Sequence, residues 1–255
     1  MTDGCAAQIS AGAVTHGSWN SVLGTTLVIK GVTPELIRDP LGVVYSHRSA
    51  DGNWLPGGAS NTGAGILARD FPNADLDALN RAAASLVPSA TVVYPLAGRG
   101  ERFPFAAPDA QSFTLGTAGT REQRYAAVLQ GVAFVERLAF DYLRYLGAPT
   151  NGRFSFTGGA AKSREWNQLR ANILEREIAI PKISEGAFGM AVLAAAHNDS
   201  IAYSSRRMVQ IQETISPERP FSEYAEQYGV FIDELAARGW LAPSIAVAAR
   251  QGVTV

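Results

Sequence analysis

The 255-residue chain contains little cysteine, little histidine and no excess of either charge. Cys5 is its only cysteine, which excludes an intramolecular disulfide and a thiolate metal site and favours a reducing, cytoplasmic setting. The three histidines, His16, His47 and His197, are far apart in the sequence, and none lies in an HExxH pattern. Metal bound by histidine and cysteine alone is therefore not expected.

The sequence also lacks a basic segment and a long apolar run. The net charge is −1 and the lysines and arginines are scattered, so no surface for nucleic acid or anionic lipid is expected. No apolar run approaches the roughly 20 residues of a membrane-spanning helix, and we expect no secretory signal, because the first residues lack its basic and apolar regions. With 47% hydrophobic and 18% charged residues, the composition is that of a globular chain with a large core.

Hydrophobic spacing and turn residues predict an α/β domain with a mixed sheet. The expected strands lie within residues 19–31, 42–47, 53–58, 91–98, 153–159 and 177–183, and the expected helices at 60–71, 74–86, 120–147, 163–176, 185–199 and 220–239. Thr120 is expected to cap the longest helix and Gly147 to close it. The last residues are interpreted as a peripheral tail.

Two glycine-containing turns are candidate ligand sites. In LGTT, Gly24 allows close approach of a phosphate, and Thr25 and Thr26 supply donors, although an ordinary β-hairpin is favoured on this stretch alone. In FTGGAAKS, a strand ends at Gly158 and Gly159 before a helix, where ligands of open α/β sheets gather. Ser163 could cap that helix or contact the ligand, and on this stretch alone a tight turn with a serine N-cap is favoured.

Two further motifs are weaker. GAGILA (63–68) matches the GxGxxA of dinucleotide sites, but no parallel βαβ unit with a ribose-binding acidic residue follows it, so we reject that interpretation. In GRGERFPF (98–105), a structural loop held by an Arg–Glu pair is preferred over a phosphate or sugar contact. The chain contains no GxSxG motif for nucleophilic catalysis.

Taken together, these segments carry a family resemblance. TDGCAAQISAG, SVLGTTLVIKG, YSHRSADGNWLPGGASNTG, GERFPF, FTGGAAKSREWNQLRANIL and EGAFGMAVLAA follow the order seen in the C-terminal half of FGGY-family carbohydrate kinases, over roughly residues 1–200. YSHR with GGASNTG is most similar to the ribulokinase/xylulokinase-like branch of cyanobacteria and plants. The resemblance implies an actin-like ATPase (ribonuclease-H-like) fold, with a mixed sheet and helices on both faces.

The resemblance also implies functional residues. Asp3, in TDG, matches the family's catalytic base, Gly24, Thr25 and Thr26 match a segment near the β- and γ-phosphates, and Gly158 and Gly159 match a pair lying along the adenosine. Ser163 falls near a side chain that contacts adenine in some members. The implied cofactors are ATP and Mg²⁺, and the implied reaction transfers the γ-phosphoryl group to a ketopentose such as D-ribulose or D-xylulose.

The same resemblance predicts a domain plan. Residues 1–200 would form the nucleotide-binding domain and residues 201–255 a helical extension of it, and the family's N-terminal sugar-binding domain would be absent. We therefore expect the 255 residues alone to be inactive without that domain, supplied in cis or in trans. The alternative is a non-catalytic nucleotide-binding or interaction module, whose exposed apolar face would promote self-association. A nuclease is disfavoured because no cluster of carboxylates can be assembled.

Overall fold

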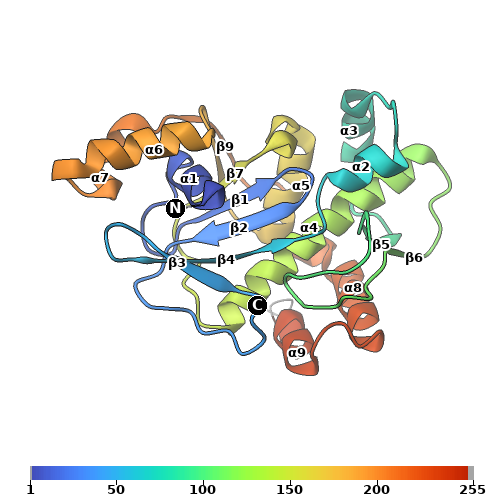
Figure 1. Ribbon diagram of the computed structural model, residues 1–255. Coiled ribbons are helices and arrows are strands. Elements are labelled where there is room, and N and C mark those ends of the chain that lie inside the picture. Colours follow the sequence, from blue (N-terminus) through green and yellow to red (C-terminus); the bar gives the residue numbers. More distant parts are fainter. Residues whose placement is uncertain (1, 252–255) are drawn as a thin grey trace.

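A seven-stranded mixed sheet runs through the molecule in the order β3-β4-β2-β1-β7-β8-β9 (Figure 1). The computed structural model describes residues 2–251, apart from the side chain of Asn198. Strands β1, β7 and β8 are parallel, and the other neighbours in this sheet pair antiparallel. The strands of this sheet are β1 (Trp19–Leu23), β2 (Leu27–Gly31), β3 (Tyr45–Arg48), β4 (Trp54–Ser60), β7 (Phe154–Thr157), β8 (Ile178–Pro181) and β9 (Ile211–Ile215).

Helices cover both faces of this sheet, and a second, two-stranded sheet pairs β5 (Val92–Tyr94) with β6 (Phe113–Leu115). The α-helices are α1 (Asp3–Ser10), α2 (Gly65–Asp70), α3 (Leu76–Ala84), α4 (Arg121–Tyr145), α5 (Arg164–Leu174), α6 (Gly186–Ala195), α7 (Ile201–Met208), α8 (Ala225–Ala237) and α9 (Pro243–Gln251). Short 3-10 turns are η1 (Gly159–Lys162), η2 (Ala196–Asn198) and η3 (Phe221–Glu223).

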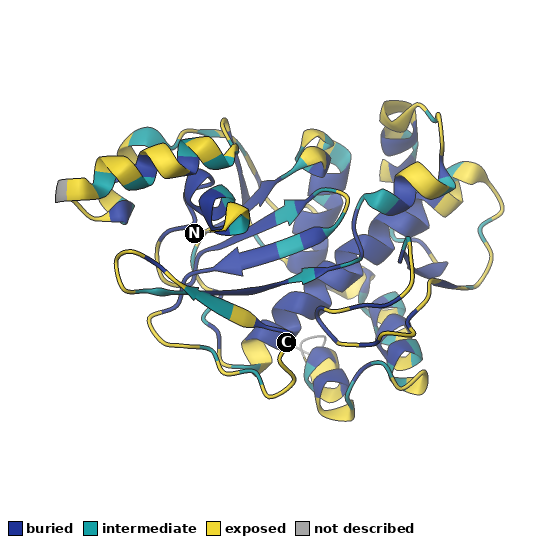
Figure 2. Ribbon diagram, in the orientation of Figure 1, coloured by how far each residue is buried: buried dark blue, intermediate teal, exposed yellow. Residues whose placement is uncertain are grey.

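The main core lies between the sheet and helices α4 and α5. Alternate strand residues point to the same face, and on this face the residues are Leu23, Leu27, Ile29, Phe154 and Phe156, all in the core cluster. Helix α4 is buried along most of its length (Figure 2). The α4 ring of Phe140 contacts the rings of Trp19 and Phe154, with centroids 5.8 and 4.7 Å away.

The opposite face of the sheet is covered by α1, which packs against α6. Gly189 of α6 lies so close to α1 that an added Cβ would be 2.0 Å from the carbonyl oxygen of Ala6. The apolar cluster on this side is small and consists of Ile9, Val14, Val192 and Ile201. Although α6 is apolar on all sides, much of it is exposed, and Met190 keeps 42% of its surface accessible.

The actin-like mixed α/β fold expected from the sequence is confirmed, as are several local signals. Thr120 caps α4 in a capping box with Gln123, and Gly147 follows α4 with a φ of +83°. Within residues 2–251, no helix is both long and apolar enough to cross a membrane.

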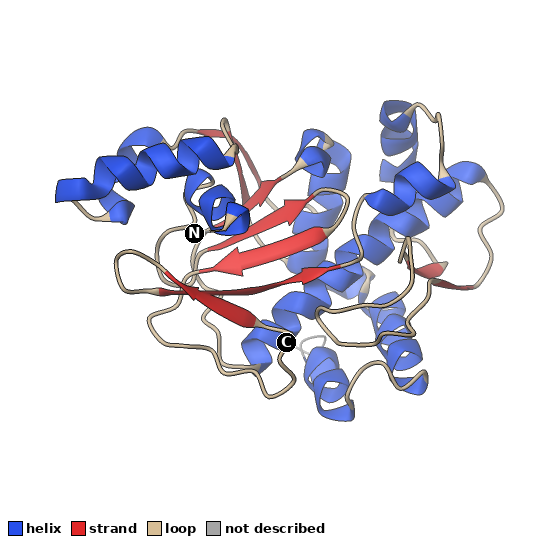
Figure 3. Ribbon diagram, in the orientation of Figure 1, coloured by secondary structure: helices blue, strands red, loops and turns tan. Residues whose placement is uncertain are grey.

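Two expectations for the C-terminal part need correction, although α7, α8 and α9 make most of it helical. The extension expected to be helical over 201–255 contains β9, which pairs antiparallel with β8 at the edge of the sheet (Figure 3). The stretch interpreted as a peripheral tail contains α9, which buries Ile245 and Ala249 in the main core. The spacing of these two residues is helical, but the apolar pattern of this segment is too short to predict a helix by itself. Residues 252–255 of this stretch lie outside the described residues.

Candidate functional site

The two predicted glycine turns lie together at the carboxyl ends of neighbouring parallel strands. β1 and β7 pair in parallel with Val22 opposite Thr157, so the turns that follow both strands leave the same edge of the sheet. Gly158 has a φ of +88°, and a Cβ there would be 2.5 Å from the carbonyl oxygen of Leu23. Only glycine fits this close approach, which brings Gly158 and Gly159 beside Gly24.

The turn formed by Gly24, Thr25 and Thr26 is held from one side by backbone hydrogen bonds. The Ala64 N–H donates to the Gly24 carbonyl at 2.8 Å, and the Gly65 N–H donates to the Thr25 carbonyl at 3.0 Å. Thr25 is exposed, and a Cβ added at Gly24 would meet no atom within 4 Å. The turn is therefore fixed through its carbonyls and open on its other side, as a phosphate-binding turn requires.

Beside this edge is a pocket of about 590 Å³, and Gly159 and Ser163 are among the residues that line it. Phe71, Tyr125 and Trp166 line it and form an aromatic wall, with the Phe71 and Tyr125 rings edge to face at 5.0 Å. The Tyr125 hydroxyl donates to Asn80 Oδ1 at 2.8 Å, and burial raises the pKa of Tyr125 to about 12. A mostly apolar hollow with a few fixed polar groups is typical of a small-ligand site.

Ser163 caps α5, and its contact with a ligand stays a prediction. Its hydroxyl accepts a hydrogen bond from the Trp166 N–H at 3.1 Å, which caps α5, and it also lines the pocket. Lys162, the exposed residue before it, lies on the same pocket wall and carries a positive charge.

Asp3 is the first residue of α1 and is exposed. A negative charge at this position is stabilised by the positive end of the helix dipole. The next residue, Gly4, lies over β2, where an added Cβ would be 3.8 Å from Val28 Cγ1. Gly4 therefore packs over β2, the strand that directly follows Thr26. Asp3 itself is not among the residues that line the pocket.

The model for the FGGY family of carbohydrate kinases, C-terminal domain, matches residues 19–198. The chain belongs to this family. The matched segment includes both glycine turns and the pocket wall, and it begins after α1, so Asp3 lies outside it.

Individual relatives of this chain are named as sugar kinases. A gluconokinase of Bacillus licheniformis is 25% identical over 91% of this chain and 49% of its own length. A probable L-xylulose kinase of Haemophilus influenzae is 26% identical over 86% of this chain and 46% of its own length. The chain thus spans about half the length of these curated relatives. The ribulokinase branch suggested by the sequence is not among the findings and stays a prediction.

Solved structures agree with the fold. A xylulose kinase from Bifidobacterium adolescentis superposes with a TM-score of 0.75 at 26% identity, over 90% of this chain and 46% of that one. A ligand-bound xylulose kinase from Lactobacillus acidophilus gives a TM-score of 0.81 at 22% identity, over 92% of this chain and 50% of that one, and at that identity it supports the fold alone.

Sequence reasoning missed the far wall of the pocket in this FGGY domain. The rejected GAGILA segment is not a dinucleotide motif, because β4 before it pairs antiparallel with β2 and forms no parallel βαβ unit. The helix that it begins nevertheless lines the pocket through Ala64 and Leu67. The small and apolar residues at the start of this helix were the available signal, but only the tertiary structure places α2 and η1 around the same pocket.

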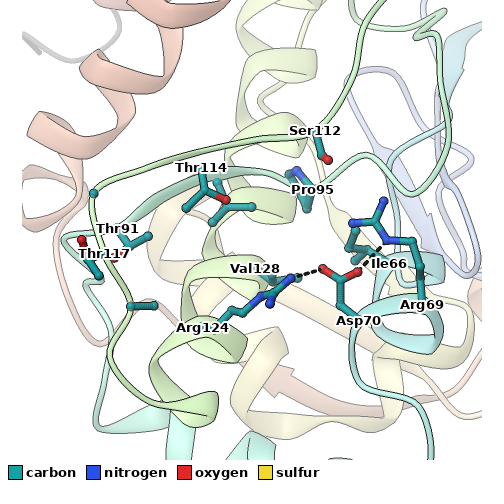
Figure 4. A pocket seen from close by; sticks show the side chains of 13 residues that line it. Ile66, Arg69, Asp70, Thr91, Pro95, Ser112, Thr114, Thr117, Arg124 and Val128 are labelled. Atoms are coloured by element: carbon teal, nitrogen blue, oxygen red, sulfur yellow. Dashed lines mark hydrogen bonds and ion pairs between the residues drawn. The ribbon is translucent and has the colours of Figure 1, made fainter.

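The other face of α2 borders a second hollow of about 380 Å³ (Figure 4). Asp70 accepts hydrogen bonds there from Arg69 and Arg124. Burial alone would raise the pKa of Asp70, but the two arginines outweigh it and hold this pKa below its usual value. No predicted site residue lines this hollow.

The expectation that an Arg–Glu pair holds the GRGERFPF loop was wrong, because Glu101 has other partners. Among the described ion pairs, none includes Glu101, and its carboxylate instead accepts hydrogen bonds from uncharged groups, including the Tyr94 hydroxyl at 2.9 Å. Burial, with the nearby charge of Glu101, raises the pKa of Tyr94, which keeps this hydroxyl a donor.

Proposed function

We propose that this chain is the nucleotide-binding half of an ATP-dependent sugar kinase. In this proposal, the adenosine occupies the pocket between Gly159 and the aromatic wall, and the phosphates extend to Gly24, Thr25 and Thr26. The observation that carries the proposal is the adjacency of the two turns at the ends of β1 and β7, beside a pocket of about 590 Å³. Family membership supports it.

Asp3 is proposed as the general base that takes the proton of the attacking sugar hydroxyl. Its exposure at the start of α1 leaves the carboxylate accessible to a substrate. Transfer of a γ-phosphoryl group needs positioning and stabilisation of negative charge. The N–H groups and hydroxyls of Thr25 and Thr26 would supply hydrogen bonds for this, since the Gly24 N–H already donates to the Thr26 carbonyl at 3.0 Å. Mg²⁺ would enter with ATP, bound through the phosphate oxygens, and would neutralise phosphate charge. We propose that the carboxylate expected to help hold it belongs to the other kinase half, which leaves Asp3 free to act as the base.

The proposed acceptor is a ketopentose such as D-ribulose or D-xylulose. Support comes from the xylulose kinases among the relatives and from the YSHR and GGASNTG segments on β3 and β4, which resemble the ribulokinase/xylulokinase-like branch. The gluconokinases among the relatives make gluconate the competing acceptor.

We also propose that phosphoryl transfer requires a second kinase half, in cis or in trans. The chain covers 49% of the gluconokinase and 46% of the L-xylulose kinase, which supports this requirement. The same coverage favours, as a second candidate, a non-catalytic module that binds nucleotide or a partner. Sugar-dependent ADP formation by the purified 255-residue chain would overturn the requirement for a second half.

Binding of ATP to the chain, measured by isothermal titration calorimetry, tests the nucleotide site. Gly24→Ala and Gly159→Ala are informative variants, because an added Cβ at either position meets no protein atom within 4 Å. Neither change is therefore expected to disturb the fold. We expect both to weaken ATP binding by about tenfold or more, since the methyl group would occupy space that the nucleotide needs.

Gly229→Ala in α8 is the matched control. It also adds a methyl group into open space, far from either turn in sequence and on a helix that does not line the pocket. ATP affinity should be unchanged in this variant. Wild-type affinity in both Gly24→Ala and Gly159→Ala, or an absence of ATP binding by the wild-type chain, would contradict the proposal.

A further inference from the structure

Glu101 is a buried carboxylate that is satisfied almost entirely by uncharged donors. Its residue surface is 4% exposed. Oε2 accepts hydrogen bonds from the Ser60 hydroxyl at 2.8 Å, the Thr62 hydroxyl at 3.1 Å and the Tyr94 hydroxyl at 2.9 Å. Oε1 accepts from the backbone N–H groups of Asn61 and Arg102, at 2.7 and 2.9 Å. Five donors thus converge on the two oxygens of one carboxylate. An ionised carboxylate, which has about four lone-pair sites and no proton to donate, is the side chain best able to accept them.

Three of these five donors belong to one short segment, residues 60–62. The same segment is held further by the Asn61 side chain, whose Nδ2 donates to the Gly100 carbonyl at 2.8 Å. Within the segment, the Thr62 N–H donates to the Ser60 hydroxyl at 2.9 Å. Glu101 and its neighbour Gly100 therefore help to hold residues 60–62, together with the pairing of Ser60 with Leu27 of β2.

Residues 62–65 in turn hold the Gly24 turn. The Leu27 N–H donates to the Thr62 carbonyl at 2.8 Å, and the N–H groups of Ala64 and Gly65 donate to the carbonyls of Gly24 and Thr25. Gly63 is packed so tightly that a Cβ there would be 2.6 Å from the Thr25 carbonyl oxygen. These contacts with residues 62–65 restrict movement of the Gly24 turn.

We propose that Glu101 is a positioning residue for phosphate binding: it fixes residues 60–62, which fix the Gly24 turn that receives the phosphates of ATP. The inference rests on the proposed function, because it assumes that the phosphates bind at this turn. Charged hydrogen bonds are stronger than neutral ones and fix geometry more tightly. A carboxylate is suited to this role because it accepts all five bonds, whereas an amide has one acceptor oxygen and would present N–H groups to the remaining donors.

The test compares ATP with adenosine, which lacks phosphates, by calorimetry on the full chain. In Glu101→Gln, we expect ATP affinity to fall about tenfold while adenosine affinity stays within about twofold of wild type. A merely structural loss would weaken both ligands alike. Circular dichroism and thermal unfolding establish that the variant is folded.

Two further variants test the role of the 60–62 segment without changing Glu101. Thr62→Val removes one donor of the 60–62 segment without changing Glu101, and it should reproduce part of the selective loss of ATP affinity. Tyr94→Phe is the matched control, because it removes a donor to the same carboxylate from β5, outside the segment, and both affinities should be unchanged. If Glu101→Gln does not fold, Thr62→Val decides the question.

The outcomes separate this inference from the proposed function. Equal weakening of ATP and adenosine in Glu101→Gln, or wild-type ATP affinity in Thr62→Val, would overturn the positioning role while leaving the nucleotide site in place. A wild-type chain that binds neither ATP nor adenosine would instead refute the proposed function, and the positioning role with it.

Discussion

The two faces of the central sheet are built from the same strands but differ in chemistry. Toward α4 and α5, β7 presents Phe154 and Phe156, which are part of the main core. Toward α1, the alternate residues Ser155 and Thr157 are also buried, yet they are polar and contact Asn20 of β1. Period-two alternation within one strand thus places an apolar surface and a polar one back to back.

This difference separates stability from chemistry. The α4 face gains its stability from burial of large apolar side chains. The α1 face keeps polar groups and a buried amine, Lys30, under the helix that carries Asp3, and its apolar cluster is small. We therefore expect the two faces to respond very differently to substitution.

Removing an aromatic ring from the α4 face should have the largest effect. Phe140→Ala leaves a cavity between Trp19 and Phe154 and is expected to lower the free energy of unfolding by about 4 kcal/mol. Ile9→Ala in the small cluster on the α1 face is expected to cost about 2 kcal/mol, because fewer atoms surround it. Urea denaturation measures both values, and equal losses would contradict the comparison.

Breaking the buried ion pair on the α4 face should rank next. Arg170 and Glu136 are both fully buried, with the guanidinium Nε 2.7 Å from the carboxylate. Glu136→Gln leaves Arg170 without its charged partner and is expected to cost about 3 kcal/mol. Arg164→Ala, which breaks an exposed pair with Glu213, is the control and should change the free energy of unfolding by less than about 0.5 kcal/mol. A change of similar size in both variants would refute this ranking.

On the α1 face, removal of a charge should stabilise the fold. Burial lowers the pKa of Lys30 from 10.5 to about 8, although Cys5 opposes this shift. The unfolded chain then binds more protons between pH 8 and 10.5, so stability rises with pH in this window and the penalty is complete below it. Lys30→Met is expected to raise the free energy of unfolding at pH 7 by about 2 kcal/mol.

The pH dependence distinguishes this charge effect from a packing effect. In chemical denaturation as a function of pH, the advantage of Lys30→Met should shrink from pH 8 to 10.5, where the wild-type lysine loses its proton in both states. A stabilisation that is constant across this range, or a destabilisation at pH 7, would show that burying the charge of Lys30 does not lower the free energy of unfolding.

The smallest expected effect concerns the polar network of the α1 face. Asn20 Nδ2 donates to the Thr157 hydroxyl at 3.1 Å. Thr157→Val removes that acceptor and should lower the free energy of unfolding by about 1 kcal/mol. Thr114→Val, at an exposed strand position, is the control and should be nearly neutral. If the two variants behave alike in thermal unfolding, the network contributes nothing measurable.

Local signals in the sequence predicted much of the fold. The capping residues Thr120 and Ser163 begin α4 and α5 where expected, because capping depends on groups within one turn. The strand β6 and the edge strand β9 were missed. Each is short and gains its hydrogen bonds from a partner distant in sequence. Residues 211–214 alternate between half-buried and exposed positions, and of this strand only Ile215 is buried.

The sequence by itself determined the residue types at the two turns and their place after strands. The reason is that glycine acts through its freedom of backbone conformation and threonine through its hydrogen-bond donors, and both effects are local. Only the tertiary structure decided that these turns are neighbours, since parallel pairing of β1 and β7 joins segments more than 130 residues apart, with Asn20 bonded to Thr157 at a separation of 137. It also decided that Tyr125 and Phe71 form a pocket wall and that Glu101 anchors residues 60–62. Such contacts follow from packing between distant elements, which no local pattern encodes.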